Sequence, residues 1–316
     1  MMRIGIQTHH AVSDEHPAED FMFLKEAGFS CVDFSLHYYL KGKDIYRENL
    51  NSFFDKDIEE LKEYFRPHKE GAAAAGIDIF QMHMPYPILV PNAREKVNHY
   101  LQDVMAPKSL EICSFMNCKY IVIHGFKIAK YIGSEEEEWK HTEAFIRKHA
   151  LMAKKLGITI CIENLYDSVG DHIVEGPCCN ARKAAERIDR INADYGAEVV
   201  GFCFDTGHAN IAGIDFEDFL MTLGKRLKVL HIHDNDGIRD LHQIPFTFTR
   251  TRDNKPSTDW NGFIRALKVT GFDGVLNFET SPVLGSFPYE MRGDVLRFIA
   301  RIGQYFAREL SIVILS

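Results

Sequence analysis

The feature that most constrains the fold of this chain is an alternation of short apolar runs with longer, polar segments of helical periodicity. Each run is four to six residues long and is rich in β-branched residues. Strands that alternate with helices form βα units, so the pattern predicts an α/β protein with a parallel sheet. The eight runs that we expect to be strands are residues 3–7, 31–34, 77–81, 120–124, 158–162, 199–204, 229–233 and 275–278.

The spacing of these runs favours one closed barrel over two open sheets. Successive runs begin 28 to 46 residues apart, and no proline- or serine-rich linker interrupts the series. A chain of 316 residues suits a single (β/α)8 barrel, which commonly exceeds about 200 residues as one domain. We therefore predict a single TIM-barrel domain over residues 1–316.

One helix has a readable beginning. Ser134 is followed three residues later by Glu137, which predicts a capping box for a helix that runs to about Leu156. The four glutamates that follow Ser134 then lie in the first turn, where the helix dipole favours anions. We interpret this acidic run as a solvated helix start.

Composition excludes several classes of function. There are 37 Lys and Arg against 45 Asp and Glu, a net charge of −8, so a broad nucleic-acid surface is not expected. No run approaches about 18 apolar residues, and the N-terminus lacks the apolar run of a secretory signal. The seven cysteines follow no CxxC pattern, which predicts reduced core residues in a cytoplasmic protein. Without a GxGxxG or Walker-type loop, no nucleotide cofactor is expected.

Residues with metal-binding and acid–base chemistry gather at the carboxyl ends of six consecutive predicted strands. Taken singly, each has an ordinary structural explanation, such as a hydrogen-bonded core histidine or a helix-capping aspartate. The strand ends of a βα barrel share one face, however, so these residues would converge. They are His83, His124, Glu163, Asp205, His208, His231, His233, Asp234, Asp236 and Glu279.

A bound cation would explain this convergence. Burying several carboxylates side by side is costly unless a positive charge compensates. Imidazoles and carboxylates on one ring suit a divalent metal, and we expect Mn²⁺ or Zn²⁺, with Co²⁺ as a further candidate.

The motifs that end strands five to eight also resemble those of a known family. They read CIENL, FDTGHANIAG, HIHDNDG and NFET. In their order and strand positions they are similar to the xylose-isomerase-like TIM-barrel superfamily. That group includes ketose 3-epimerases, inosose isomerases and dehydratases, and zinc-dependent apurinic-site endonucleases. The resemblance extends from Ile4 to about Glu290.

The resemblance to the epimerase branch implies one metal ion with four ligands: Glu163, Asp205, His231 and Glu279. The histidine assignment has an alternative two residues away. His233 shares a strand face with His231, because side chains alternate with period two. We favour His231 because its HxxD context resembles the metal histidine of the family.

Further residues are expected to contact substrate. By resemblance, the position of His208 binds substrate or a further metal. Arg239 could orient a substrate oxygen by a forked contact, and a loop surface charge is the alternative. The predicted substrate-binding residues are His83, His124, His208, His233, Arg239, Asp240 and His242.

The implied function is a metal-dependent sugar or polyol isomerase or epimerase, and Glu163 and Glu279 are the expected catalytic residues. The metal would polarise a carbonyl and stabilise an enediolate, while the two carboxylates remove and return a proton. Return to the opposite face gives epimerisation, and return to the neighbouring carbon gives isomerisation. Loss of water from a keto-polyol would use the same enolate.

Two alternatives come from other classes. The strand-end residues, together with Asp240 and His242, resemble the ligand set of trinuclear apurinic-site endonucleases, although the net charge of −8 argues against a DNA-binding face. A non-catalytic sugar-binding barrel ranks last, because none of the four metal ligands is replaced. As partners we expect a small sugar or polyol, with no nucleic acid and no membrane.

Two predicted connections are longer than a barrel needs. Residues 35–55 follow strand two and residues 234–259 follow strand seven, both on the face where barrel enzymes place their sites. In the first connection, Tyr38 and Tyr39, together with His37, could form a wall of the site, or could pack between loop and barrel. These loops and the apolar tail could also serve a homo-oligomer interface.

Overall fold

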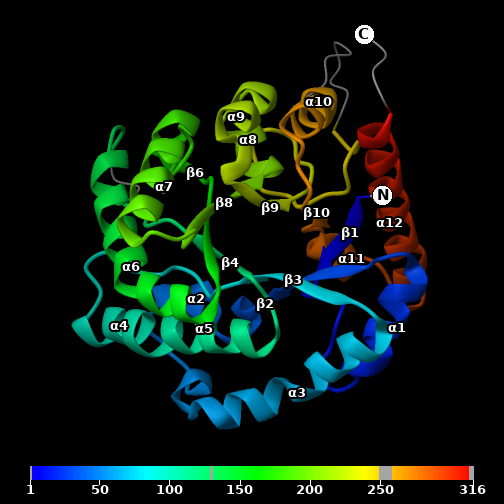
Figure 1. Cartoon of the computed structure of the whole chain (residues 1–316), viewed down its shortest axis with the longest axis horizontal. Helices are drawn as coiled ribbons and strands as arrows, with labels where there is room; N and C mark the ends of the chain where they lie inside the picture. Colours follow the sequence, from blue (N-terminus) through cyan, green and yellow to red (C-terminus); the bar gives the residue numbers. More distant parts are fainter. Residues whose placement is uncertain (1, 129–130, 249–257, 313–316) are drawn as a thin grey trace.

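Eight parallel strands form the core of the fold in a computed structural model, which describes residues 2–128, 131–248 and 258–312 (Figure 1). The sheet order is β10-β1-β2-β3-β4-β5-β8-β9. A parallel bridge between Ile232 and Phe278 joins the two ends and closes the barrel. The strands are β1 Arg3–Gln7, β2 Cys31–Ser35, β3 Asp78–His83, β4 Tyr120–His124, β5 Thr159–Glu163, β8 Val200–Asp205, β9 Leu227–His231 and β10 Val275–Phe278.

Helices surround this barrel, and the predicted α/β TIM-barrel class is confirmed (Figure 1). Three predicted strands match to the residue, and the other five differ by one or two residues at one or both ends. A π-helical turn at Tyr100–Met105 joins α4 to α5. The helices are α1 Pro17–Ala27, α2 Gly42–Tyr46, α3 Ile58–Ala75, α4 Glu95–His99, α5 Ala106–Phe115, α6 Glu135–Leu156, α7 Ala181–Tyr195, α8 Thr206–Ile211, α9 Phe216–Leu223, α10 Trp260–Thr270, α11 Ser281–Ser286 and α12 Arg292–Ser311.

A small antiparallel hairpin between β5 and α7 was not predicted. Its strands are β6, Tyr166–Val169, and β7, His172–Glu175. Each has only four residues, and most of their side chains are at least partly exposed. Such short strands carry too few apolar residues to give a period-two signal in the sequence.

The start of α6 corrects the predicted capping box. Ser134 has helical dihedral angles and no capping hydrogen bond. Its hydroxyl instead donates to Glu138 Oε1 at 3.0 Å, and the same oxygen accepts from the backbone of Ile128 at 2.8 Å. Glu138 is buried and therefore holds the preceding loop, whereas the prediction treated the whole acidic run as solvated. The helix does end at Leu156, as expected.

The interior of the barrel is apolar at one end and polar at the other. Four fully buried residues of β4, β5, β8 and β9 form a small cluster inside the barrel. Because side chains on one strand face recur every two residues, the next inward position on each of these strands lies at its carboxyl end. The apolar residues are Val122, Cys161, Cys203 and Val229, and the residues two positions later are His124, Glu163, Asp205 and His231.

The burial of the cysteines and the character of the helices match what the composition predicts. All seven cysteines are free and buried, as predicted. No helix among the described residues is both long and apolar enough to span a membrane.

Candidate metal centre

The ends of four strands bring the four predicted metal ligands together. Glu163 ends β5, Asp205 ends β8, His231 ends β9, and Glu279 directly follows β10. One ligand atom from each of these residues lies within 4.8 Å of the ligand atoms of the other three. Glu163, Asp205 and His231 are almost completely buried.

Three polar atoms of this quartet lack a hydrogen-bond partner among the described residues. Both carboxylate oxygens of Glu163 and Nδ1 of His231 are buried without a hydrogen-bond partner among the described residues. His231 Nδ1 lies 3.3 Å from Glu163 Oε2 and 3.2 Å from Glu279 Oε2. Unpaired buried polar atoms are costly, and a divalent cation between them would satisfy all three residues. The donor set therefore fits a metal such as Mn²⁺, Zn²⁺ or Co²⁺.

The orientation of His231 is set by a residue that the sequence analysis missed. Its Nε2 lies 2.9 Å from Oδ2 of Asp33, which is fully buried in β2. Gln81 Nε2 donates to the same oxygen at 3.2 Å. This contact turns Nδ1 of His231 toward the carboxylates, which is how metal-bound histidines are commonly held. A charged residue inside the apolar strand CVDFS was the available signal.

The two candidate histidines of β9 and its extension lie in different groups. His233 Nε2 lies 3.0 Å from Asp205 Oδ2, and its ring is stacked on His242 at 4.0 Å. A second possible metal group is formed by His233, His242 and Glu279, whose ligand atoms also lie within 4.8 Å of one another. His231, the preferred residue, belongs to the quartet, and His233 does not.

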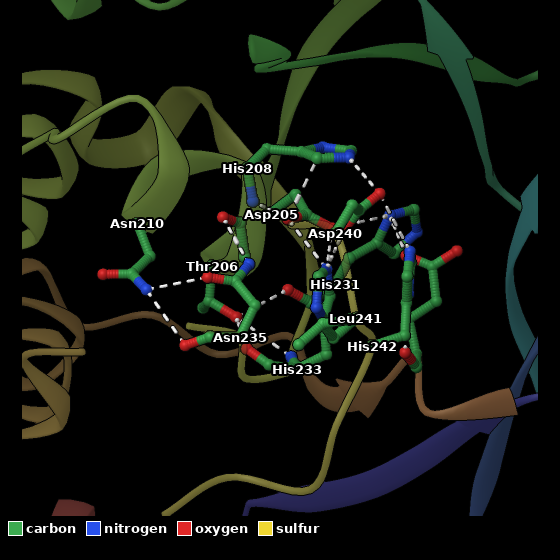
Figure 2. Close-up of polar contacts among 12 residues, drawn as sticks. Asp205, Thr206, His208, Asn210, His231, His233, Asn235, Asp240, Leu241 and His242 are labelled. Carbon is green, nitrogen blue, oxygen red and sulfur yellow. Dashed lines mark hydrogen bonds and ion pairs between the residues drawn. The ribbon is translucent and has the colours of Figure 1, made fainter. Parts of the chain in front are cut away.

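Asp240 connects the histidines beside this second group (Figure 2). Its Oδ2 lies 3.3 Å from His208 Nε2 and 3.2 Å from His242 Nε2. Burial would lower the pKa of His242, but the hydrogen bond with Asp240 and the charge of Glu279 raise it to about 9. The connection that follows β9 thus contributes directly to the polar cluster, although its residues 249–257 lie outside the described part of the chain.

Histidines also surround Glu163. His83 and His124 place Nε2 at 3.5 and 3.4 Å from Glu163 Oε2, and His208 places Nδ1 at 3.0 Å from Oε1. Burial alone would raise the pKa of Glu163, but the charges of His231 and His124 hold it well below the ordinary value. Glu163 is therefore an ionised carboxylate surrounded by imidazoles.

The structure does not bring Arg239 to the cluster. Its side chain is 71% exposed and makes a forked contact with Asp236, at 3.0 and 2.7 Å. Of the seven predicted substrate-binding residues, Arg239 alone lies apart from the polar cluster. Its position matches the alternative interpretation, a charged residue on the surface of a loop.

Two further residues near the cluster, Gln7 and Tyr86, were not singled out in the sequence, whereas His37 was considered for a wall of the site. Gln7 ends β1 and donates through Nε2 to Glu279 Oε1 at 2.6 Å. Tyr86 is stacked on His124 at 4.0 Å, and His37 is stacked on Tyr86 at 3.9 Å. These rings form an aromatic wall that extends outward from the cluster. The position of Gln7 at a strand end was a signal, but an amide is a weaker indicator of chemistry than a carboxylate.

A glycine makes room for His233. A Cβ atom on Gly207 would lie 1.9 Å from His233 Cε1 and 2.4 Å from its Nδ1. The DTGH motif of α8 therefore needs glycine at this position, because the imidazole packs directly against the helix backbone.

Comparison with known proteins agrees with this architecture. A family model described as a xylose isomerase-like TIM barrel matches residues 21–297 and confirms the predicted resemblance. An uncharacterized protein, y4fM, of Sinorhizobium fredii is 32% identical over 127 residues, which cover 36% of this chain and 37% of that protein. The uncharacterized protein MJ1188 of Methanocaldococcus jannaschii is 24% identical over 284 residues, 88% of each chain. An inosose isomerase of Bacillus licheniformis is 24% identical over 174 residues, 54% of this chain and 56% of that protein.

Solved structures share the fold at lower sequence identity. A D-psicose 3-epimerase determined in the presence of D-fructose has a TM-score of 0.66 at 15% identity, covering 96% of this chain and 99% of that one. The IOLI protein with a bound zinc atom has a TM-score of 0.61 at 17% identity, covering 98% and 100%.

Proposed function

Because the chain belongs to the xylose isomerase-like TIM barrel family, we propose that it is a metal-dependent sugar or polyol isomerase or epimerase. The observation that carries the proposal is the buried quartet of Glu163, Asp205, His231 and Glu279, with its unpaired polar atoms. The relative named as an inosose isomerase and the fold shared with a D-psicose 3-epimerase support the substrate class.

The quartet would hold one divalent cation, Mn²⁺, Zn²⁺ or Co²⁺. When bound, the cation supplies Lewis-acid polarisation of a substrate carbonyl. Polarisation acidifies the neighbouring C–H bond, and the protein must then supply a base at that carbon.

Glu163 and Glu279 are the two groups that would move the proton. Their strands are separated by β8 and β9 on one side of the barrel and by β1 to β4 on the other, so the carboxylates reach the cluster from different sides. One would remove the proton from carbon, and the other would return it on the opposite face. The imidazoles around Glu163 favour its ionised form, and Gln7 orients Glu279.

The substrate hydroxyls would be held by the remaining polar side chains of the cluster. Histidine and aspartate together offer donors and acceptors, which suits a polyol. The six residues assigned to this role are His83, His124, His208, His233, Asp240 and His242. Arg239 is left out, because its guanidinium is engaged with Asp236 at the surface.

The decisive experiment follows exchange of carbon-bound protons with solvent. Ketoses and inososes are incubated with the metal-loaded protein in D₂O, and loss of the proton signal is followed by NMR. Glu163→Gln and Glu279→Gln should each lower exchange by about 10²–10⁴-fold, the usual contribution of general acid–base catalysis. Glu186→Gln, an exposed position on α7, is the matched control and should behave as wild type. Wild-type exchange rates in either active-site variant would contradict the two-carboxylate mechanism.

A zinc-dependent phosphodiesterase is the second candidate, and the group His233, His242 and Glu279 favours it as a further metal site. Elemental analysis of protein purified without added ions separates the two. About one metal per chain supports the sugar reaction, and close to three zinc ions call for an assay on DNA with an abasic site. Asp240→Ala should be mild in the first case and should reduce metal content in the second. Water loss from a keto-polyol would appear in the NMR experiment as a dehydrated product.

A further inference from the structure

A cavity of about 960 Å³ lies at the carboxyl ends of β1 and β2, beside the polar cluster. Its walls come from residues 8–16, from the segment after β2, and from the beginnings of α1 and α12. Thr8 lies on its wall and directly follows Gln7, whose amide reaches Glu279. The backbone N–H of Ser35, also on the wall, donates to Thr8 Oγ1 at 3.1 Å. The cavity therefore adjoins the place where substrate would react.

The size of the cavity exceeds the need of a single sugar ring. Pockets for drug-sized molecules span roughly 300–1,000 Å³, and this one lies near the upper limit. None of the four quartet residues lines it. The space is therefore additional to that around the metal ligands, and it could take a second unit of a larger substrate.

Aromatic faces with unused polar atoms line the cavity next to the cluster. The rings of His9 and His10 are stacked at 4.1 Å, and the ring of Tyr38 lies 6.0 Å from that of His9. No hydrogen bond or ion pair within the described residues engages the ring nitrogens of His9 and His10 or the Tyr38 hydroxyl. Burial lowers the pKa of His9 to about 4, so at neutral pH its ring offers one donor and one acceptor.

The charges on the wall favour a neutral ligand. Arg292 contributes a donor, since its Nε is buried without a hydrogen-bond partner among the described residues. Carboxylates outnumber the guanidinium groups on the wall, so the wall would repel an anion. A cation would be repelled by Arg292. Hydroxyl groups can both donate to carboxylates and accept from guanidinium. The charged wall residues are Asp14, Glu15, Glu19, Asp20, Glu290, Arg292 and Arg297.

We propose that this cavity is a second sugar-binding subsite, which takes a neutral, glycosidically linked unit, so that the preferred substrate is a two-unit keto-glycoside. The reacting unit would lie at the metal quartet, and the proposal rests on the proposed function in that respect. Stacked on Tyr38 and His9, the second unit would exchange hydrogen bonds with imidazole, guanidinium and carboxylate groups of the wall.

Calorimetric titration tests the subsite without requiring turnover. The probes are D-fructose, the ketose disaccharides lactulose and isomaltulose, and fructose 6-phosphate, each added to the metal-loaded protein. At least one disaccharide should bind at least tenfold more tightly than D-fructose. Tyr38→Ala and Arg292→Ala should each remove most of that advantage. Tyr38 is 52% exposed, so its truncation should leave the fold intact, which thermal unfolding verifies. Phe298→Ala, an exposed position on α12 outside the cavity, is the control and should keep the advantage.

The possible outcomes separate the subsite from the reaction. Equal affinity for D-fructose and both disaccharides would overturn the subsite, even if proton exchange proves the isomerase. Tighter binding of fructose 6-phosphate that depends on Arg292 would make the cavity an anion site and would also overturn the proposal. A disaccharide advantage that depends on Tyr38 and Arg292 supports the subsite, and proton exchange on that disaccharide then tests the reaction. If exchange is absent from every sugar, the proposed function fails while the binding site stands.

Discussion

At the scale of single residues, hydrogen-bond partners decide what each histidine of the cluster can do. His231 and His233 are two positions apart and equally buried. Asp33 holds Nε2 of His231, so its Nδ1 faces Glu163 and Glu279, whereas Nε2 of His233 faces Asp205. The two histidines thus direct different ring nitrogens toward the carboxylates of the quartet, Nδ1 in His231 and Nε2 in His233, because their neighbours differ.

Asp33 should therefore control metal affinity without touching the metal. Asp33→Ala removes the partner that orients His231, and such changes typically weaken metal binding by about 10–100-fold. Asp33→Asn keeps a hydrogen-bond acceptor for His231 Nε2 and should therefore lose less metal affinity. Competition with a chromogenic chelator measures the metal dissociation constant for both variants. Equal, wild-type affinity in both would show that Asp33 does not position His231.

At the scale of elements, the close packing of α8 against the extension of β9 sets the position of His233. Gly207→Ala places a methyl group inside the imidazole ring of His233, so the ring or the helix must move. Overpacking of this kind costs roughly 1–3 kcal/mol. We expect a lower free energy of unfolding in urea together with reduced proton exchange. Gly285→Ala, whose Cβ would meet only ordinary contacts, is the control. A variant with wild-type stability and exchange would contradict the packing argument.

Helix α6 contains a buried histidine that should make the protein acid-sensitive. Burial, and then the charge of Lys148, lowers the pKa of His149 to about 4, against about 6.5 in the unfolded chain. The unfolded chain therefore takes up the proton more readily. This contribution to stability is complete above about pH 6.5 and is lost as the pH falls toward 4.

His149→Gln removes this titration. Between pH 7 and pH 4, the free energy of unfolding of the wild type should fall by up to about 3 kcal/mol more than that of the variant. Urea unfolding at several pH values provides the comparison. Parallel pH profiles for the two proteins would show that His149 is not buried in its neutral form.

At the scale of the whole molecule, the barrel concentrates carboxylates from distant parts of the sequence at one rim. Glu163 ends β5, Asp205 ends β8 and Glu279 directly follows β10. Asp240 adds a further carboxylate from the connection after β9. Their mutual repulsion opposes folding unless positive charge compensates it, and a bound divalent cation would add such charge to that of the surrounding histidines. Metal binding and folding should therefore be coupled.

Removal of the metal should lower the melting temperature. A ligand at about 100 times its Kd stabilises the folded state by roughly 2.7 kcal/mol, which corresponds to several degrees in a protein of this size. Treatment with EDTA should produce this loss, and added Mn²⁺ or Zn²⁺ should reverse it. Glu163→Gln, which removes a ligand charge, should respond less to either treatment. A melting temperature that is the same with EDTA and with metal would argue against a metal site in the quartet.

The sequence by itself determined the class of fold and the candidate metal ligands. Eight apolar runs with regular spacing left a parallel barrel as the natural arrangement, and the strand-end rule placed ten polar residues on one rim. The resemblance of the strand-end motifs to the xylose-isomerase-like superfamily then implied Glu163, Asp205, His231 and Glu279 as the metal ligands. These inferences depend on short-range patterns, namely strand periodicity and the motif that ends each strand. Local patterns of this kind can be recognised from the order of residues alone.

Only the tertiary structure decided which partners these residues have. The contact between Asp33 and His231 joins residues 198 positions apart, and the bond from Gln7 to Glu279 spans 272 positions. Three further features depend in the same way on how the loops pack against the barrel. They are the exposed position of Arg239, the short hairpin of β6 and β7, and the cavity beside β1. A linear pattern reports which side chains can bind a metal, but closure of the barrel brings distant residues within reach and so selects their hydrogen bonds.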